Sequence, residues 1–116
     1  MSRLLGPDVV SDEGLRELVG QGHLVEVVCL EPAERRGDVW YGLWGIRSVA
    51  PDGGSARILV AWRHDKPRGV DRPRTFRTLN GLASFLRGLG FAVVSIPFEA
   101  GGEVRHPLGG PEARPD

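Results

Sequence analysis

Residues 74–98, RTFRTLNGLASFLRGLGFAVVSIPF, constrain the fold more than any other stretch, because all their local signals agree on one order of elements. Thr78 has the side chain of a helix N-cap, and the apolar residues after it recur at spacings of three and four, which places them on one side of an α-helix. Gly90 is typical of the left-handed residue that follows a helix. Residues 91–98 are apolar and β-branched up to Pro97. The stretch therefore predicts a short strand, a helix and a largely buried strand over 91–98.

The N-terminal part of the chain predicts one short helix and one strand. Ser11 or Asp12 is the expected cap of a helix that ends near Val19. Residues 24–30, LVEVVCL, have high β propensity and predict a strand. Residues 31–38, EPAERRGD, contain proline, glycine and mostly charged side chains, so we expect a polar turn there.

An aromatic strand over 39–50 and a strand over 57–63 are expected next, joined by the turn signal PDGG at 51–54. Both faces of the first strand are apolar, which is typical of a central strand or of one that covers a core on one side and a partner on the other. One face carries Trp40, Trp44 and Ile46, and the other carries Val39, Tyr41, Leu43 and Val49. On the second strand, Ile58, Val60 and Trp62 share a face.

The order of these elements predicts an α+β two-layer sandwich: an antiparallel β-meander with a further C-terminal strand, and one long and one short helix packed against it. With 116 residues the chain is long enough for one domain with a substantial core, which we place at 11–98. Residues 1–10 are expected to be a flexible lead-in. Residues 99–116, rich in glycine and proline, are expected to be a disordered tail.

Charge and cysteine content limit the classes of function. Fifteen basic and fifteen acidic residues cancel, so the chain lacks the global positive charge that drives sequence-independent binding of nucleic acid. Cys29 is the only cysteine, which excludes an intrachain disulfide and fits a reducing compartment. No apolar run is long enough to cross a membrane, and the start of the chain does not resemble a secretory leader. We expect a soluble, cytoplasmic protein without membrane contact.

The sequence contains no pattern typical of a catalytic, cofactor-binding or metal site. His23, His64 and His106 fall in a turn, a basic loop and the expected tail, without carboxylates at ligand spacing, so we interpret them as surface histidines. Cys29 is flanked by apolar residues and is expected to be a small buried hydrophobe. We therefore predict no catalytic residue, no cofactor and no metal, and a protein that is not an enzyme.

The candidate partner interface combines a basic loop with the aromatic side chains. Residues 63–77 hold six basic and two acidic residues, a local excess of four positive charges, which suits an acidic protein or a nucleic-acid backbone. A solvated loop and three tryptophans packed in the core are the simpler alternative. The candidate residues are Trp40, Trp44, Trp62, Arg63, Arg68, Arg72, Arg74 and Arg77. A homodimer is expected, because a strand apolar on both faces needs a cover on each.

Three segments, GHLVEVVCL, RRGDVWYGLWGIRSVAPDG and RTFRTLNGLASFLRGLGF, together resemble the small ParC-type partition-associated proteins of plasmids and integrative elements. The resemblance covers residues 11–99. It implies a non-enzymatic accessory protein of a mobile genetic element that acts in plasmid partition or maintenance, through protein-protein contacts with a ParA-type ATPase and a ParB-type centromere-binding protein. It assigns a role to no individual residue.

Two other functions remain open from the sequence. The first is an inhibitor of host defence of the anti-CRISPR type, which would bind a Cas protein tightly. The second is a weak DNA-binding accessory that uses the basic loop, whose affinity would fall steeply with salt.

Overall fold

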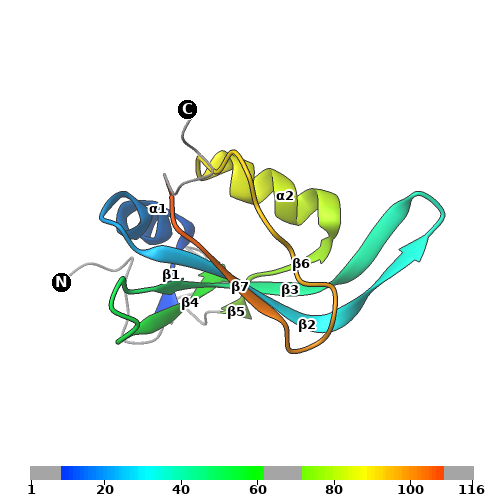
Figure 1. Ribbon diagram of the computed structural model, residues 1–116, viewed down its shortest axis with the longest axis horizontal. Helices are drawn as coiled ribbons and strands as arrows, with labels where there is room; N and C mark the ends of the chain where they lie inside the picture. The colour runs from blue at the N-terminus through cyan, green and yellow to red at the C-terminus, as the bar shows by residue number, and fades with distance from the viewer. Residues whose placement is uncertain (1–8, 62–71, 109–116) are drawn as a thin grey trace.

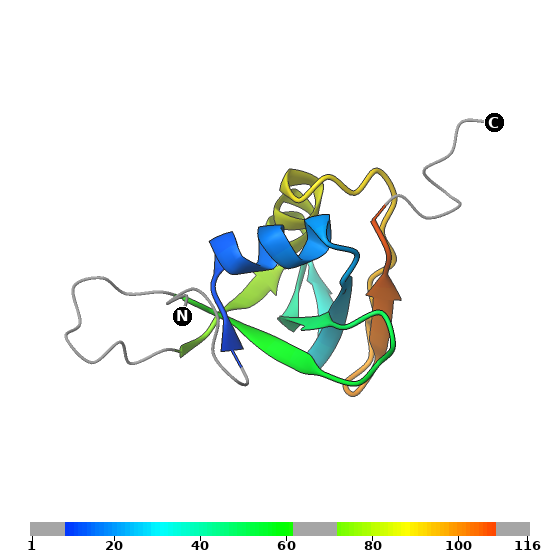
Figure 2. The same ribbon diagram turned by 90° about the vertical axis from the view of Figure 1, so that its left-hand side faces the viewer.

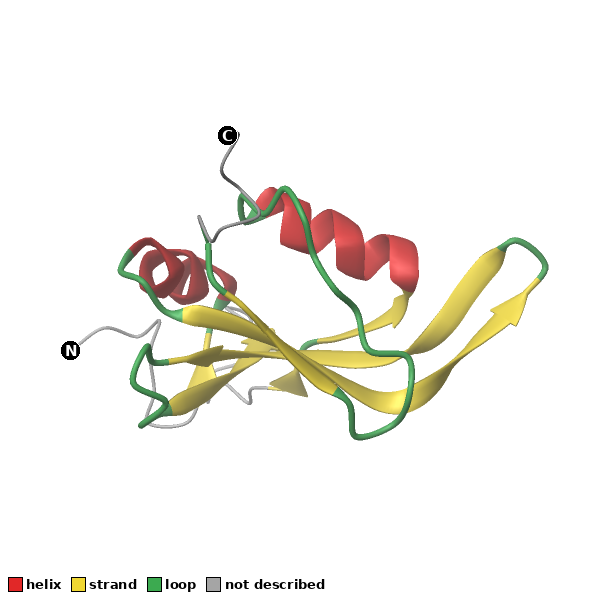
Figure 3. Ribbon diagram, in the orientation of Figure 1, coloured by secondary structure: helices red, strands yellow, loops and turns green. Residues whose placement is uncertain are grey.

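The structure, a computed structural model, describes residues 9–61 and 72–108. In this part of the chain, two helices lie on one face of a curled sheet, which gives an α+β fold of two layers (Figure 1, Figure 3). The elements in chain order are β1 (Val9–Val10), α1 (Asp12–Gly20), β2 (Leu24–Arg36), β3 (Val39–Val49), β4 (Ala56–Ala61), β5 (Arg72–Pro73), β6 (Thr75–Thr78), α2 (Leu79–Gly88) and β7 (Glu103–His106).

The sheet is mixed, with the strand order β1-β4-β3-β2-β7. β5 pairs with β4, and β6 pairs with β3 beside its N-terminal half. The predicted pairings of β2 with β3 and of β3 with β4 are antiparallel, as expected. The sheet as a whole is mixed and extends beyond the predicted antiparallel meander, because β1 joins β4 in parallel through Val9 and Val10.

Both predicted helices are present, and side-chain caps explain where they begin. Ser11 Oγ accepts a hydrogen bond of 3.0 Å from the backbone N–H of Gly14, and Thr78 Oγ1 accepts one of 3.0 Å from that of Gly81. Gly90 follows α2 with a φ of 112°, the left-handed conformation that the sequence predicted. The apolar stripes of both helices face the sheet and form the core with it (Figure 2).

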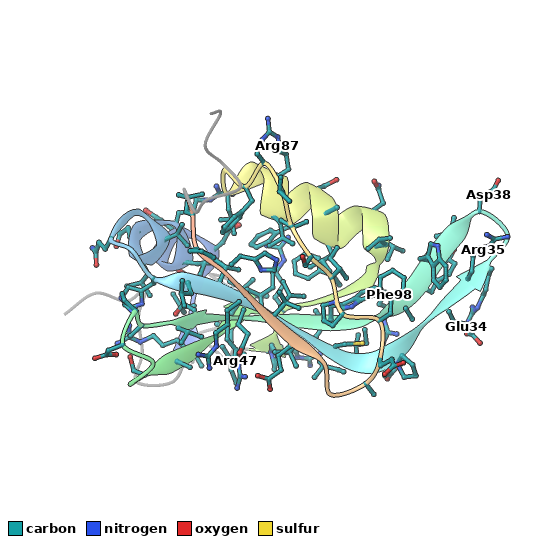
Figure 4. The ribbon with its side chains drawn as sticks, in the orientation of Figure 1. Glu34, Arg35, Asp38, Arg47, Arg87 and Phe98 are labelled. Atoms are coloured by element: carbon teal, nitrogen blue, oxygen red, sulfur yellow. The ribbon has the colours of Figure 1, made fainter. Side chains whose placement is uncertain are left out.

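Residues 31–38 were expected to be a turn, but β2 continues through them to Arg36. The turn contains only Gly37 and Asp38, and Gly37 has a φ of 63° that suits a two-residue hairpin. The two strands extend as an arm beyond the rest of the sheet, with Glu34, Arg35 and Asp38 near its tip (Figure 4). A charged sequence can form strands here because both faces of the arm's tip are exposed, so its side chains stay in water.

The buried strand expected over 91–98 is absent, and the C-terminal strand is β7 instead. Residues 91–98 cross the helix-covered face of the sheet as irregular chain, with Val94 and Ile96 packed against the core. The indole N–H of Trp44 donates a hydrogen bond of 2.8 Å to the carbonyl of Pro97 on this segment. An apolar sequence can thus cover a sheet without joining it, and composition alone does not separate the two cases.

β7 lies inside the segment 99–116 that we expected to be disordered, so that expectation was wrong for residues 103–106. The strand pairs antiparallel with β2, and His106 lies opposite Val25. A few long-range contacts order this polar segment: the N–H of Cys29 donates to the carbonyl of Gly102 at 2.9 Å, and that of Gly101 donates to the carbonyl of Cys29 at 2.8 Å. The expectations for residues 1–8 and 109–116 lie outside the described residues.

Gly42 is required by the close approach of the Trp44 ring. A Cβ built at Gly42 would lie 2.8 Å from the Cη2 atom of Trp44, closer than carbon atoms approach in proteins. Trp44 is fully buried, so its ring has no free space to move into. We expect Gly42→Ala to lower the free energy of unfolding by roughly 1–3 kcal/mol, the range for overpacking a well-packed core. Urea denaturation followed by tryptophan fluorescence measures the change.

Gly45→Ala is the matched control on the same strand. A Cβ there would lie 3.6 Å from a terminal methyl of Leu30, which is an ordinary contact. We expect this variant to unfold within about 0.5 kcal/mol of the parent protein. If the two substitutions destabilise the protein equally, the cause is the loss of glycine from the strand and not a clash with the Trp44 indole.

Candidate interaction surface

A carboxylate is buried in the middle of the sheet. Val25 and Val27 of β2 point into the core, so Glu26 between them points to the opposite face, where no helix of the described residues lies. We call this side the helix-free face. The Glu26 side chain is only 1% exposed. It lies between Arg47 on β3 and Arg105 on β7, its two cross-strand neighbours.

Two guanidinium groups bind the two oxygens of this carboxylate separately. Arg47 Nε donates a hydrogen bond of 2.6 Å to Glu26 Oε1, and Arg105 Nε donates one of 3.0 Å to Glu26 Oε2. Burial raises the pKa of Glu26, but the hydrogen bonds from Arg105 and Arg47 outweigh it, so the pKa lies below its ordinary value. Glu26 is therefore a charged residue with a structural task, which is to join β2 to both neighbouring strands.

A groove of about 350 Å³ lies on the helix-free face beside this cluster. Its apolar lining includes Leu30 and Ile58, which are 49% and 43% exposed. Arg47 on its rim lies on the side of the sheet away from the helices (Figure 4). The full lining is Val28, Leu30, Gly45, Ile46, Arg47, Ile58, Pro73, Arg74, Thr75 and Glu103. Exposed aliphatic side chains bordered by charged groups are typical of a protein-binding surface.

The thiol of Cys29 and the groove lie on opposite faces of the sheet. Cys29 lies on the opposite, core side of β2, and burial raises the pKa of its thiol, which keeps the nucleophilic thiolate scarce. Within residues 9–61 and 72–108, the His, Cys, Asp and Glu side chains form no group of three that could hold a metal ion. The arginines and the carboxylates on this surface bind each other.

The three tryptophans of the candidate interface do not form one exposed surface. Trp44 is fully buried in the core, so its assignment to the interface is corrected. Trp40 is half-buried, and its ring packs against that of Phe98 with the centroids 5.1 Å apart. Trp62 lies outside the described residues, as do Arg63 and Arg68.

The other predicted arginines are separated from one another. Arg72 on β5 is exposed. The guanidinium of Arg74 lies 4.8 Å from the centroid of the Phe85 ring and 3.4 Å from the carboxylate of Asp12, so its charge is already partly compensated. It thereby ties α1 to α2 and lines the groove as well.

Arg77 belongs to a second, polar pocket of about 240 Å³ at the base of the arm. The pocket also contains Glu31, Glu34, Arg36 and the ring of Tyr41. Arg36 lies over that ring at 5.1 Å and pairs with Glu34 at 3.2 Å. Carboxylates thus balance the positive charge near Arg77, which makes this pocket a poor match for a phosphate backbone.

Two buried polar residues, Glu26 and His106, were not predicted from the sequence. Glu26 interrupts the apolar run LVEVVCL, and a lone charge in such a run is the signal for a buried ion pair. His106 was expected on the surface but is buried, with Nδ1 3.2 Å from the carbonyl of Val25 and Nε2 accepting a hydrogen bond of 2.9 Å from the N–H of Ser95. No local sequence pattern reveals these two contacts.

The chain matches no protein-family model, no curated protein and no solved structure. In the part of the chain that the structure describes, neither helix has the length and apolar character needed to cross a lipid bilayer.

The buried carboxylate predicts a specific pH dependence of stability. Because the pKa of Glu26 is lower in the folded protein than its ordinary value of 4.5, its stabilising effect is complete above that pH and is lost as the pH falls through the folded-state pKa. At pH 7 we expect Glu26→Gln to lower the free energy of unfolding by roughly 1–3 kcal/mol, a moderate cost because both arginines stay partly in water. The difference between the two proteins should shrink below pH 4.5.

Denaturant unfolding across this pH range measures the difference, and Glu34→Gln is the matched control. Glu34 is on the same strand and pairs with Arg36, but its side chain is 68% exposed. We expect the control to change stability by no more than about 0.5 kcal/mol at any pH. A Glu26→Gln effect that is independent of pH would contradict a charged Glu26 in the folded state.

Proposed function

We propose that the protein is a non-enzymatic accessory protein of plasmid or integrative-element partition, and that it acts in the cytoplasm by binding a ParA- or ParB-type protein. The proposed binding site is the groove on the helix-free face. The observation that carries the proposal is the exposure of Leu30 and Ile58 at the centre of a folded sheet, next to a charged rim. The partition context comes from the resemblance of the sequence to ParC-type proteins.

The chemistry of the groove suggests what the partner presents to it. Aliphatic lining favours one or two apolar side chains, which would bury Leu30 and Ile58. Both Nε and Nη2 of Arg47 contact Glu26, and Nη2 also lies 3.8 Å from Glu103, but the Arg47 side chain is still 36% exposed, so a further carboxylate can reach it. We therefore propose a segment of the partner in which apolar side chains are flanked by a carboxylate that binds Arg47.

The positions of the arginines favour a protein partner over DNA. Among the candidate residues that the structure describes, Arg74 is paired with Asp12 and Arg77 lies among the carboxylates at the base of the arm. Binding to a phosphate backbone needs several cations that face one ligand together. The three candidate arginines that the structure describes do not do so: Arg72 is exposed on β5, Arg74 lies beside Asp12, and Arg77 lies in the pocket at the base of the arm.

Binding of the purified protein to purified ParA- and ParB-type proteins of the same host, followed by biolayer interferometry, tests this function. We expect one of the two to bind, and we expect Leu30→Glu or Ile58→Glu to weaken that binding tenfold or more, as for a central apolar contact of an interface. The control is Val93→Glu, which changes an apolar residue that is 52% exposed but lies in the segment that crosses the helix-covered face. It should leave the affinity unchanged.

Other ligands in the same assay separate the alternatives. Absence of binding to both partition proteins would overturn the proposal. Binding to a Cas protein instead would identify an inhibitor of host defence. Binding to duplex DNA that weakens steeply with salt would identify a DNA-binding accessory.

The homodimer expected from the sequence remains a prediction, but the structure removes half of the reason for it. That reason was an aromatic strand in need of cover on both faces. In the structure the chain itself covers Trp44, through Pro97 and the helices.

A further inference from the structure

β7 is an edge strand of the sheet. It stands at the end of the strand order, and among residues 9–61 and 72–108 it pairs only with β2 (Figure 2). An edge strand presents backbone N–H and C=O groups that are free to pair with another strand. Only every second residue of β7 presents such groups, because the backbone groups of the residues between them face β2.

The hydrogen bonds next to β7 establish which of its residues face β2 and which face outward. Both backbone groups of Cys29 bind the β7 side, its N–H to Gly102 and its C=O to Gly101. Residues that exchange hydrogen bonds alternate along an antiparallel ladder, so Val104 and His106 direct their backbone groups toward β2. Glu103 and Arg105 therefore direct theirs away from the sheet.

The same two residues carry opposite charges on the helix-free face. One row of side chains runs from Arg47 through Glu26 to Arg105, alternating in sign across three strands. It ends at the edge in a cation that is 51% exposed. The row beside it ends in Glu103, an anion that is also 51% exposed. The edge thus presents one positive and one negative group, two residues apart.

We propose that a second copy of this chain pairs antiparallel with β7 about a two-fold axis at Val104. In this register Glu103 lies opposite Arg105 of the partner subunit, and Arg105 lies opposite the partner subunit's Glu103. Each pair exchanges backbone hydrogen bonds, because both residues direct their N–H and C=O groups outward. The two sheets join into one, and the alternation of charge continues from Arg105 to the partner's Glu103.

The charges select this register among those that two-fold symmetry allows. Neighbouring symmetric registers that also bring outward-directed groups together centre on Glu103 or on Arg105. They place two carboxylates or two guanidinium groups directly opposite each other, which is unfavourable. Arg105 can bind a second carboxylate because it uses only Nε for Glu26, and its terminal nitrogens carry further donors.

This dimer does not rest on the partner binding proposed above: Glu103 also lines the groove, but each proposal is tested with its own ligand and variants, so either can fail alone. Sedimentation equilibrium of the full chain over a range of micromolar concentrations measures the dimer dissociation constant. We expect a reversible dimer, and we expect Glu103→Arg to raise its dissociation constant roughly tenfold, since two attractive cross-strand pairs become repulsive. Glu99→Arg is the matched control, with the same change of charge at an exposed position four residues earlier. It should leave the constant unchanged.

A mixture of two variants tests the register directly. Arg105→Glu places like charges opposite each other in its own homodimer, but it complements Glu103→Arg in a heterodimer. Mixing the two should restore dimerisation. Circular dichroism establishes that each variant is folded, because Arg105→Glu also removes a hydrogen bond to Glu26.

If Arg105→Glu does not fold, Glu103→Pro provides the second test. It removes an N–H that points away from the sheet, together with the carboxylate that lies near Arg47, and proline is tolerated at such edge positions. It should also weaken the dimer. A monomer at all concentrations would overturn the proposal, as would a dimer that neither Glu103→Arg nor Glu103→Pro weakens.

Discussion

The indole of Trp44 is the group on which much of the described structure depends. A ring of this size stabilises the core of a small domain strongly, but its N–H must find an acceptor once it is buried. The carbonyl of Pro97 supplies that acceptor. The hydrogen bond fixes where the chain passes after α2, and the same ring leaves no room for a side chain at Gly42.

The helices could be predicted from the sequence because their signals are local. Thr78 caps α2 and Gly90 follows it, and both roles depend on neighbours within a few positions. The strand after α2 could not be predicted in the same way. Residues 91–98 have the composition of a strand, but β2 pairs with the polar segment at 103–106 instead. Whether a segment forms a strand depends on the strand with which it pairs, which can lie far away along the chain. One sequence alone does not show which segment that partner strand is.

The candidate surface was predicted only in part for a similar reason. The largest aromatic and basic side chains were the predicted interface, but in the structure Trp44 belongs to the core and Arg74 joins the two helices. The exposed apolar residues that line the groove on the helix-free face are aliphatic ones, Leu30 and Ile58. Their exposure follows from the curvature of the sheet and from the placement of both helices on one face, which no local pattern encodes.

The separation of β2 and β7 along the chain has a consequence for synthesis. Glu26 meets Arg47 only 21 residues later, across a tight hairpin, whereas Arg105 follows 79 residues after it. While the chain is being made, β2 therefore has one paired edge and one open edge. An open edge with an apolar sequence is a template for association with other nascent chains. The carboxylate of Glu26, which is buried in the finished sheet, is an exposed charge at that open edge. There it opposes pairing with other chains until β7 has been synthesised and pairs with β2.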